Sequence, residues 1–457
     1  MATRQVIIGG GPAGMNAIET IRGYDANASI TLISNEPAYA RMALPYVISG
    51  QIQERQVLTG DDGYFSRLGV TTKFGSRVTG INPSGNSLTL SDGSSVGYDN
   101  LLIATGSSPQ KLNIPGADGA GVYNLWTIDD ARKTMASLKG EAEVAFVGAG
   151  FIGFIILNAL YKLGAKLHVI ELEGQILPRM LDAQGASLVN TWLSQRSIAT
   201  HTGVKVTEIG DGGGKKSVRL SDGSVIQADI VIMATGIKTN IDFLQGSGLK
   251  TNQGILIDHS CRTNIANIYA AGDVAEGPDL STGDNAIHAI QPTAVDHGRI
   301  AGANMAGQGV QYPGSLLINI LDVCGLQCAS FGLWKGDGLE TTTSVNATRP
   351  IYRKLVWKGD KLVGSILLGP ADDVAMLNDM GMIKGLIQAG TALGAWKHHI
   401  QENPTDIRRP YVATKTAEKL LAVTTLGKPA AHRAYQSSHD SGKERGAHAV
   451  LMGTKSA

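Results

Sequence analysis

Two copies of one glycine pattern restrict what this chain of 457 residues can fold into. In each copy a short apolar segment enters a G-x-G-x-x-G turn and a helical segment follows. The next apolar segment ends beside an acidic residue, Glu36 in the first copy and Glu171 in the second. The turns contain Gly9, Gly11 and Gly14, and then Gly148, Gly150 and Gly153. One such turn is a weak signal, but two in the same setting predict two Rossmann-like units that each bind a dinucleotide.

The three glycines of each turn have distinct roles. The first allows a tight turn, the second lets the backbone approach a pyrophosphate, and the third lets the helix pack on the strand. The helix N-terminus adds partial positive charge for the phosphates. We predict that neighbouring residues also line the two sites: Pro12, Ala13, Phe151 and Ile152. We expect the carboxylates of Glu36 and Glu171 to accept hydrogen bonds from ribose hydroxyls. Because the Glu171 carboxylate repels a 2′-phosphate, NADH is expected rather than NADPH.

Composition excludes several classes of protein. Forty Lys and Arg against 39 Asp and Glu leave no net field to hold nucleic acid. Three cysteines cannot form a disulfide framework in so long a chain, which indicates a reducing compartment, so we expect a cytoplasmic protein. The uncharged run Val144–Tyr161 is long enough for a membrane span, yet its glycine spacing favours a strand, a turn and a buried helix.

These motifs resemble those of the FAD-dependent pyridine nucleotide oxidoreductases, flavoproteins with two dinucleotide-binding domains. The resemblance includes an ATG turn after each unit, Ala104-Thr105-Gly106 and Ala234-Thr235-Gly236. It also includes a strand that ends in Gly272 and Asp273, and it implies that Asp273 hydrogen-bonds the ribityl chain of FAD. A later helix, starting near Pro292 and Thr293, is implied to face the pyrimidine end of the flavin, where its dipole stabilises negative charge. The resemblance further places Val78 among the FAD contacts.

The segment Pro37–Gly50 distinguishes branches of this family. Its Leu-Pro-Tyr sequence resembles coenzyme A disulfide reductases, but Met42 occupies the position of their redox cysteine. A thioether cannot form a thiolate or a mixed disulfide. The pattern Tyr39-x-Arg41 instead resembles the flavin domains of NADH-dependent nitrite reductases, NADH oxidases and rubredoxin reductases. We expect Arg41, Met42 and Pro45 to form the redox site, with Arg41 stabilising an anionic reduced flavin.

We predict an α/β fold with two Rossmann-like, three-layer dinucleotide-binding domains and a C-terminal α+β interface domain. The expected boundaries are 1–113 and 246–311 for the FAD-binding domain, 114–245 for the NAD(H)-binding domain, 312–428 for the C-terminal domain and 429–457 for a flexible tail. The C-terminal part resembles the corresponding module of the nitrite-reductase-like branch. A hairpin is expected at Gly359-Asp360, and a helical stretch near Val374–Ile400.

Cysteines and histidines of the C-terminal part give little support for a further site. On one extended strand Cys324 and Cys328 would lie about 13 Å apart, so we expect core packing and no disulfide. His398 and His399 are adjacent and project about 100° apart on a helix, which makes a poor metal pair. We therefore expect no metal site.

The predicted activity is that of an FAD-dependent enzyme that takes hydride from NADH and passes electrons to oxygen, a quinone or a redox protein without a redox cysteine. Ile155 replaces a glutamate that many relatives have beside the nicotinamide, but hydride transfer needs no acid there. Two alternatives stay open: an NADH-dependent polysulfide or disulfide reductase, and an NAD(H)-sensing flavoprotein that acts through partner binding. We expect a homodimer with no membrane span and no nucleic-acid partner.

Overall fold

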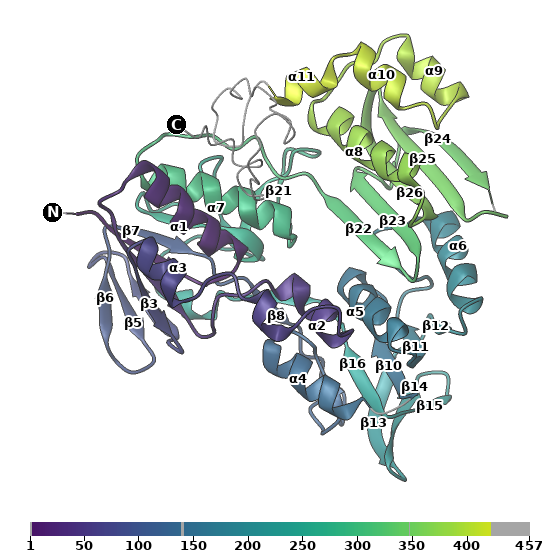
Figure 1. Cartoon of the computed structure of the whole chain (residues 1–457), viewed down its shortest axis with the longest axis horizontal. Helices are drawn as coiled ribbons and strands as arrows, with labels where there is room; N and C mark the ends of the chain where they lie inside the picture. Colours follow the sequence, from purple (N-terminus) through teal and green to yellow (C-terminus); the bar gives the residue numbers. More distant parts are fainter. Residues whose placement is uncertain (1, 139–140, 347, 422–457) are drawn as a thin grey trace, which may run out of the picture.

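The computed structural model describes residues 2–138, 141–346 and 348–421 (Figure 1). The predicted tail, 429–457, lies outside the described residues. Three five-stranded sheets carry most of the architecture in the described part of the chain, two of them parallel and the third antiparallel. The predicted α/β fold with two Rossmann-like domains is confirmed, and the C-terminal domain, predicted as α+β, is rich in strands.

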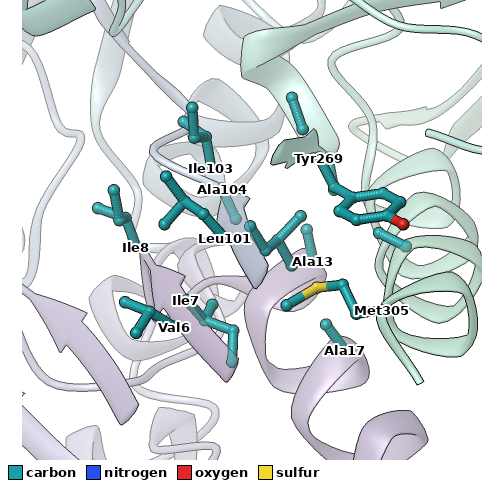
Figure 2. Packing of buried hydrophobic residues seen from close by; sticks show 14 of the residues in the cluster. Val6, Ile7, Ile8, Ala13, Ala17, Leu101, Ile103, Ala104, Tyr269 and Met305 are labelled. Carbon is teal, nitrogen blue, oxygen red and sulfur yellow. The ribbon is translucent and has the colours of Figure 1, made fainter. Parts of the chain in front are cut away.

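The first module is built on a parallel sheet with the strand order β19-β7-β1-β2-β3. Its strands are β1 (Arg4–Ile8), β2 (Ser29–Ser34), β3 (Val70–Phe74), β7 (Asn100–Ile103) and β19 (Ile268–Ala270). Helices α1 (Pro12–Tyr24) and α7 (Gln291–Met305) pack on each other, and α3 (Asp62–Arg67) packs on β3. Figure 2 shows Val6, Ile7 and Ile8 of β1 against Ala13 and Ala17 of α1. A strand covered on both faces needs such an unbroken apolar run.

The second module repeats this design, with the strand order β12-β11-β10-β16-β9. Its strands are β9 (Val122–Tyr123), β10 (Glu143–Val147), β11 (Lys166–Glu171), β12 (Ala199–Thr202) and β16 (Ile230–Met233). Its helices are α4 (Ile128–Ser137), α5 (Phe151–Lys162) and α6 (Ala183–Ser194). The uncharged run that begins at Val144 is therefore a strand, a turn and a helix, as predicted. No helix of the described ranges is long and apolar enough to cross a membrane.

Small antiparallel sheets accompany the two modules. Three-stranded meanders are formed by β4 (Val78–Asn82), β5 (Ser87–Leu90) and β6 (Ser95–Gly97), and by β13 (Val206–Gly212), β14 (Lys215–Leu220) and β15 (Val225–Ala228). A third sheet has β18 (Ile255–Leu256), β20 (Ala275–Pro278) and β21 (Asn285–Ala286). Strands β8 (Ser107–Pro109) and β17 (Ile237–Thr239) pair with each other. Because β8 leaves the first sheet and β17 leaves the second, this pair joins the two modules.

Among the described residues, the C-terminal domain has an antiparallel sheet with the strand order β22-β23-β26-β25-β24 and four α-helices (Figure 1). The strands are β22 (Ile318–Val323), β23 (Leu326–Gly332), β24 (Glu340–Asn346), β25 (Ile351–Lys358) and β26 (Lys361–Pro370). The helices are α8 (Val374–Gln388), α9 (Trp396–Glu402), α10 (Arg408–Ala413) and α11 (Thr416–Leu421). The predicted two-residue hairpin turn at Gly359 and Asp360 is confirmed, since Lys358 pairs with Lys361.

Two expectations for this domain were wrong. The helical stretch predicted near Val374–Ile400 is interrupted, because α8 ends at Gln388 and two glycines with positive φ, Gly390 and Gly394, precede α9. Cys324 and Cys328 do not share an extended strand. Cys324 lies in the turn between β22 and β23, at φ 51°, and only Cys328 is on β23. Both thiols are free and buried in one apolar cluster, as expected for core packing.

Candidate dinucleotide and redox site

The first glycine turn has the shape of a phosphate cradle. Gly9 has φ 110°, and a methyl group on it would lie 2.1 Å from the Ala104 carbonyl oxygen. A methyl group on Gly14 would lie 2.0 Å from the Gly9 carbonyl oxygen. Gly11 directly precedes α1, and no other atom would lie within 4 Å of a methyl group added to it. Two glycines therefore let the chain close on itself, and the third leaves open space at a helix N-terminus.

The second glycine turn repeats this geometry at the start of α5. Gly148 has φ 103°, and its added methyl group would lie 2.4 Å from the Ala234 carbonyl oxygen. The same group on Gly153 would lie 2.9 Å from the Gly148 carbonyl oxygen, whereas Gly150 has open space. The first turn of α1 contains Pro12 and Ala13, and the first turn of α5 contains Phe151 and Ile152. Both cradles thus fit a pyrophosphate held by backbone N–H groups.

The two ATG turns hold the modules together. Thr105 Oγ donates to the Asn240 carbonyl oxygen at 3.0 Å, and Asn240 Nδ2 donates back to the Thr105 carbonyl oxygen at 2.8 Å. Thr235 Oγ donates to the Gln110 carbonyl oxygen at 3.1 Å. Gly106 and Gly236 have φ 64° and 105°. Each ATG turn therefore forms hydrogen bonds with the segment that follows the other ATG turn. The sequence did not indicate Asn240 and Gln110 as site residues, because their bonding partners are distant in the chain.

Glu36 and Arg41 form a compact charged unit at the end of β2. Arg41 Nη2 lies 2.5 Å from Glu36 Oε1, and the Tyr39 hydroxyl donates to Glu36 Oε2 at 2.5 Å. Burial is the main cause that raises the pKa of Tyr39, so this hydroxyl keeps its proton at neutral pH. Each carboxylate oxygen retains a second lone pair, so the predicted ribose contact of Glu36 stays possible.

Asp273 lies just after the end of β19 and directly follows Gly272, which has φ 76°. Its Oδ2 accepts a hydrogen bond from Ser107 Oγ at 2.8 Å. Burial raises the pKa of Asp273, while the Ser107 bond and the charge of Arg41 oppose that rise. Gly272 also lies beside helix α7, since a methyl group on it would come within 3.4 Å of Ala294 Cβ.

Helix α7 begins at Gln291 and carries Pro292 and Thr293 in its first turn. The helix comes so close to α1 that a methyl group on Gly298 would lie 2.2 Å from the Ala13 carbonyl oxygen. The strand end at Asp273, the first cradle and the N-terminus of α7 are thus held in one region by small residues.

Glu171 stabilises the second cradle. Its Oε2 accepts from the Ala149 amide at 2.7 Å, and its Oε1 accepts from the Glu173 amide at 3.0 Å. The carboxylate therefore fixes the loop between two of the cradle glycines, beside the site where we predict the NADH ribose.

A cavity of about 480 Å³ lies where all three parts of the chain meet. The segment before and within α2 (Leu44–Ile48) contributes Met42 and Pro45, and α5 contributes Phe151 and Ile155. Gln291 of α7 and residues 320–322 of β22 complete the wall. The structure thus brings Met42, Pro45, Phe151 and Ile155 together. Val78 lies outside this cavity, buried in the core of the first module, and its backbone pairs with Leu90.

Comparison with known proteins identifies the family. The family model described as pyridine nucleotide-disulphide oxidoreductase matches residues 3–298. The chain belongs to this family. A second model, the rubredoxin NAD+ reductase C-terminal domain, matches residues 318–384.

Several relatives are similar over most of the chain. The NADH-dependent phenylglyoxylate dehydrogenase subunit epsilon of Aromatoleum evansii is 30% identical, and the alignment covers 89% of this chain and 96% of that protein. The NADH oxidase of Methanocaldococcus jannaschii is 32% identical over 72% of this chain and 76% of its own length. The chain spans only 49% of the assimilatory nitrate reductase electron transfer subunit of Bacillus subtilis. The solved NAD-dependent persulfide reductase from A. fulgidus has a TM-score of 0.79 and 29% identity, covering 86% of this chain and 78% of that chain.

As a pyridine nucleotide-disulphide oxidoreductase, the chain is an FAD-dependent enzyme that accepts hydride from NADH. When bound, FAD supplies the ring that receives the hydride and releases electrons to an acceptor. We propose the first cradle, with Glu36, Arg41 and Asp273, as the FAD site, and the second cradle, with Glu171, as the NADH site. Gln291, the first residue of α7, lines the cavity, so the partial positive charge of this helix N-terminus lies at the cavity wall.

This member of the pyridine nucleotide-disulphide oxidoreductases has no thiol in the shared cavity. Its three cysteines, Cys261, Cys324 and Cys328, are all buried in apolar clusters. Burial raises the pKa of each thiol above its ordinary value, which keeps all three protonated at neutral pH. Within the described residues, no group of three or more His, Cys, Asp or Glu could hold a metal ion, and His399 instead pairs with Asp406 at 2.8 Å.

Proposed function

We propose that this enzyme passes electrons from NADH, through FAD, directly to a separate redox protein. The observation that carries the proposal is the shared cavity, which is lined by residues of both dinucleotide-binding modules and of the C-terminal domain but by no cysteine. Without a thiol as an intermediate carrier, electrons leave from the flavin itself. A flavin can receive two electrons as hydride and release them one at a time, which suits a one-electron carrier.

The wall of the cavity supports a protein acceptor. Met42, Tyr46 and Ile320 are large apolar residues that line it, yet they are 43%, 51% and 44% exposed. They come from two different parts of the chain, the segment around α2 and strand β22. Exposed apolar side chains at the mouth of a functional cavity favour a docking partner that covers them. Small, weak interfaces of this kind are typical of electron-transfer complexes.

The relatives favour the same class of acceptor. One is a subunit of a larger dehydrogenase, and another is the electron transfer subunit of a nitrate reductase. The C-terminal domain matches a family model that is described by its link to rubredoxin. We infer that the partner of this chain is a protein redox centre, either a free carrier or another subunit.

One experiment tests the proposal. The purified holoenzyme is reduced anaerobically with NADH and then mixed separately with rubredoxin, cytochrome c, oxygen, a soluble quinone and cystine, while flavin absorbance reports reoxidation. We expect reoxidation by a protein carrier to be at least about tenfold faster than by oxygen or quinone, or about 1.4 kcal/mol in barrier height. Equal or faster reoxidation by oxygen or quinone would contradict the protein acceptor but not the NADH-to-FAD step.

Polysulfide or disulfide reduction is the second candidate function. The similarity to a persulfide reductase favours it, over 86% of this chain. The position of Met42 and the burial of all three thiols weigh against a route through a protein cysteine. This activity would therefore require the sulfur substrate to react at the flavin without an enzyme thiol.

We also propose that the enzyme is a cytoplasmic homodimer. Free, buried cysteines suit a reducing compartment. Val374 and Leu377 of α8 are 67% and 41% exposed, and a second copy of the chain could cover this apolar face. Light scattering coupled to gel filtration tests the dimer, and a monomer at micromolar concentration would contradict it.

A further inference from the structure

Trp126 connects Arg41 to strand β8. Its carbonyl oxygen accepts from Arg41 Nη1 at 2.9 Å, and its ring centroid lies 5.1 Å from Arg41 Cζ. Its indole Nε1 donates to the Ser107 carbonyl oxygen at 3.2 Å. One half-buried side chain and its own carbonyl therefore hold an arginine and a strand that are far apart in the sequence.

The main chain of Trp126 is itself fixed. Its amide and that of Thr127 both donate to Asp130 Oδ2, at 3.0 and 2.9 Å, in the capping box that starts α4. The preceding residue, Leu125, is buried and has φ 52°, a conformation that a non-glycine residue rarely adopts. The cap and the bend together fix the direction in which the indole points.

The two residues that Trp126 contacts, Arg41 and Ser107, bring a positive and a negative charge into one environment. Arg41 carries the positive charge, and Ser107 holds the Asp273 carboxylate through its hydroxyl at 2.8 Å. The charge of Arg41 acts on Asp273, since it opposes the effect of burial on that carboxyl. The Trp126 carbonyl oxygen accepts a hydrogen bond from Arg41, and the Trp126 indole donates one to the Ser107 carbonyl oxygen. Trp126 therefore sets the relative positions of both charges.

Trp126 also crosses between the two modules. It follows β9, which belongs to the second sheet, and precedes α4, whereas Arg41 and Ser107 follow strands of the first sheet. The contact between Arg41 and Trp126 is thus a link between the part of the chain assigned to NADH and the part assigned to FAD.

We propose that Trp126 is a positioning residue that orients the Arg41 guanidinium toward the bound flavin and couples this orientation to the NADH-binding module. The inference goes beyond the proposed function and rests on the predicted role of Arg41 as a group that acts on the flavin. It predicts that Trp126 affects the flavin through Arg41 and not through general stability.

The test uses the holoenzyme with Trp126→Ala, Trp126→Phe, Arg41→Ala and the double variant Trp126→Ala/Arg41→Ala. Two quantities are measured: the midpoint potential of the bound flavin, and the rate constant for its anaerobic reduction by NADH. Trp192 offers a matched control, because its Nε1 donates to the Val323 carbonyl oxygen at 3.0 Å and its ring centroid lies 3.3 Å from Arg196 Cζ. Trp192→Ala removes the same kinds of contact outside the cavity.

We expect Trp126→Ala to make the potential more negative and to slow reduction about tenfold, because a misdirected Arg41 stabilises the anionic reduced ring less well. Both variants keep the main-chain carbonyl that accepts from Arg41, but Trp126→Phe also keeps an aromatic ring beside the guanidinium. It should therefore fold and move both quantities less, in the same direction. In the Arg41→Ala background, Trp126→Ala should add no further change, which is the non-additivity of residues that act as a unit. Trp192→Ala should leave the potential unchanged.

Three results would overturn the inference. The first is an unchanged potential in Trp126→Ala, or in Trp126→Phe if the alanine variant does not bind FAD. The second is an effect of Trp126→Ala that adds fully to that of Arg41→Ala. The third is an unchanged potential in Arg41→Ala, which would remove the group through which Trp126 acts. The proposed function would survive all three results, since NADH reduction and electron transfer to a protein carrier are measured separately.

Discussion

The Glu36 carboxylate lies between two donors of its own segment, Arg41 Nη2 at 2.5 Å and the Tyr39 hydroxyl at 2.5 Å. This unit stands at the carboxyl end of β2, where a Rossmann-like unit binds the ribose of its dinucleotide. The side chains of Glu36 and Arg41 are 27% and 33% exposed, so each charge depends on the other for compensation.

Replacing Glu36 with Gln should weaken FAD binding. The amide keeps the shape of the side chain but leaves the Arg41 charge uncompensated and offers the ribose a poorer acceptor. We expect the dissociation constant for FAD to rise about tenfold, or about 1.4 kcal/mol, in a titration of the apoprotein. Asp99→Asn is the control, because Asp99 pairs with Arg4 at 2.7 Å near the opposite end of β1. An equal loss in both variants would contradict a specific role for Glu36.

Two glycine substitutions in the first cradle should have different consequences. Gly11 has φ −76° and open space around its added methyl group, so Gly11→Ala should fold normally but place that group where the pyrophosphate approaches. FAD affinity should fall at least about tenfold while the unfolding temperature of the apoprotein stays nearly unchanged. Gly14→Ala should instead destabilise the apoprotein by about 1–3 kcal/mol, since its methyl group meets the Gly9 carbonyl oxygen. Thermal unfolding and FAD titration of both variants separate the two effects.

Replacing Glu171 with Gln should reduce the preference for NADH. The amide oxygen can still accept from the Ala149 amide, so the loop should remain folded, but the charge that repels a 2′-phosphate is lost. The ratio of kcat/KM for NADH to kcat/KM for NADPH should fall about tenfold. Glu208→Gln, in exposed strand β13, is the control for a charge removed elsewhere in the module. A ratio that stays constant in Glu171→Gln would disprove the assigned ribose contact.

Asp273→Asn should weaken FAD binding but stabilise the apoprotein, and the stabilisation should depend on pH. Burial raises the pKa of Asp273 in the folded apoprotein, so the ionised carboxylate costs stability once the pH rises above the ordinary aspartate range. The asparagine variant avoids this cost. Its apoprotein should be more stable than the parent at pH 7, and the gain should disappear as the pH falls below about 4, where the unfolded carboxyl is also protonated. FAD affinity should decrease, because the amide loses one acceptor.

Replacing all three cysteines with alanine should leave catalysis intact. Each thiol is buried outside the cavity, so the triple variant should lose some stability but reduce its flavin with NADH at the parent rate. Turnover with cystine or polysulfide, where present, should also persist. A selective loss of sulfur-substrate turnover, with the NADH step unchanged, would favour a disulfide reductase that uses a protein thiol.

The glycine turns show how much of the site is local. Gly9 and Gly148 adopt positive φ and approach Ala104 and Ala234, and these four residues belong to motifs that are visible in the sequence. Glycine spacing also identified the run that begins at Val144 as a strand, a turn and a helix. Local patterns failed at the turn between β22 and β23, although Gly325, at φ 89°, lies in it. Cys324 has φ 51° in a tight hairpin, and its sequence reads as a continuous strand.

Short motifs were enough to predict the two dinucleotide cradles, the acidic residue after each, and Met42 in the position of a redox thiol. These properties follow from short spacings that the backbone must obey. Other features became visible only in the folded chain: Arg41 contacts both Glu36 and Trp126, each ATG turn bonds to the segment that follows the other, and β22 lines the cavity. Such contacts join residues far apart in the chain, and their energies depend on burial and distance, which exist only once the modules have packed together.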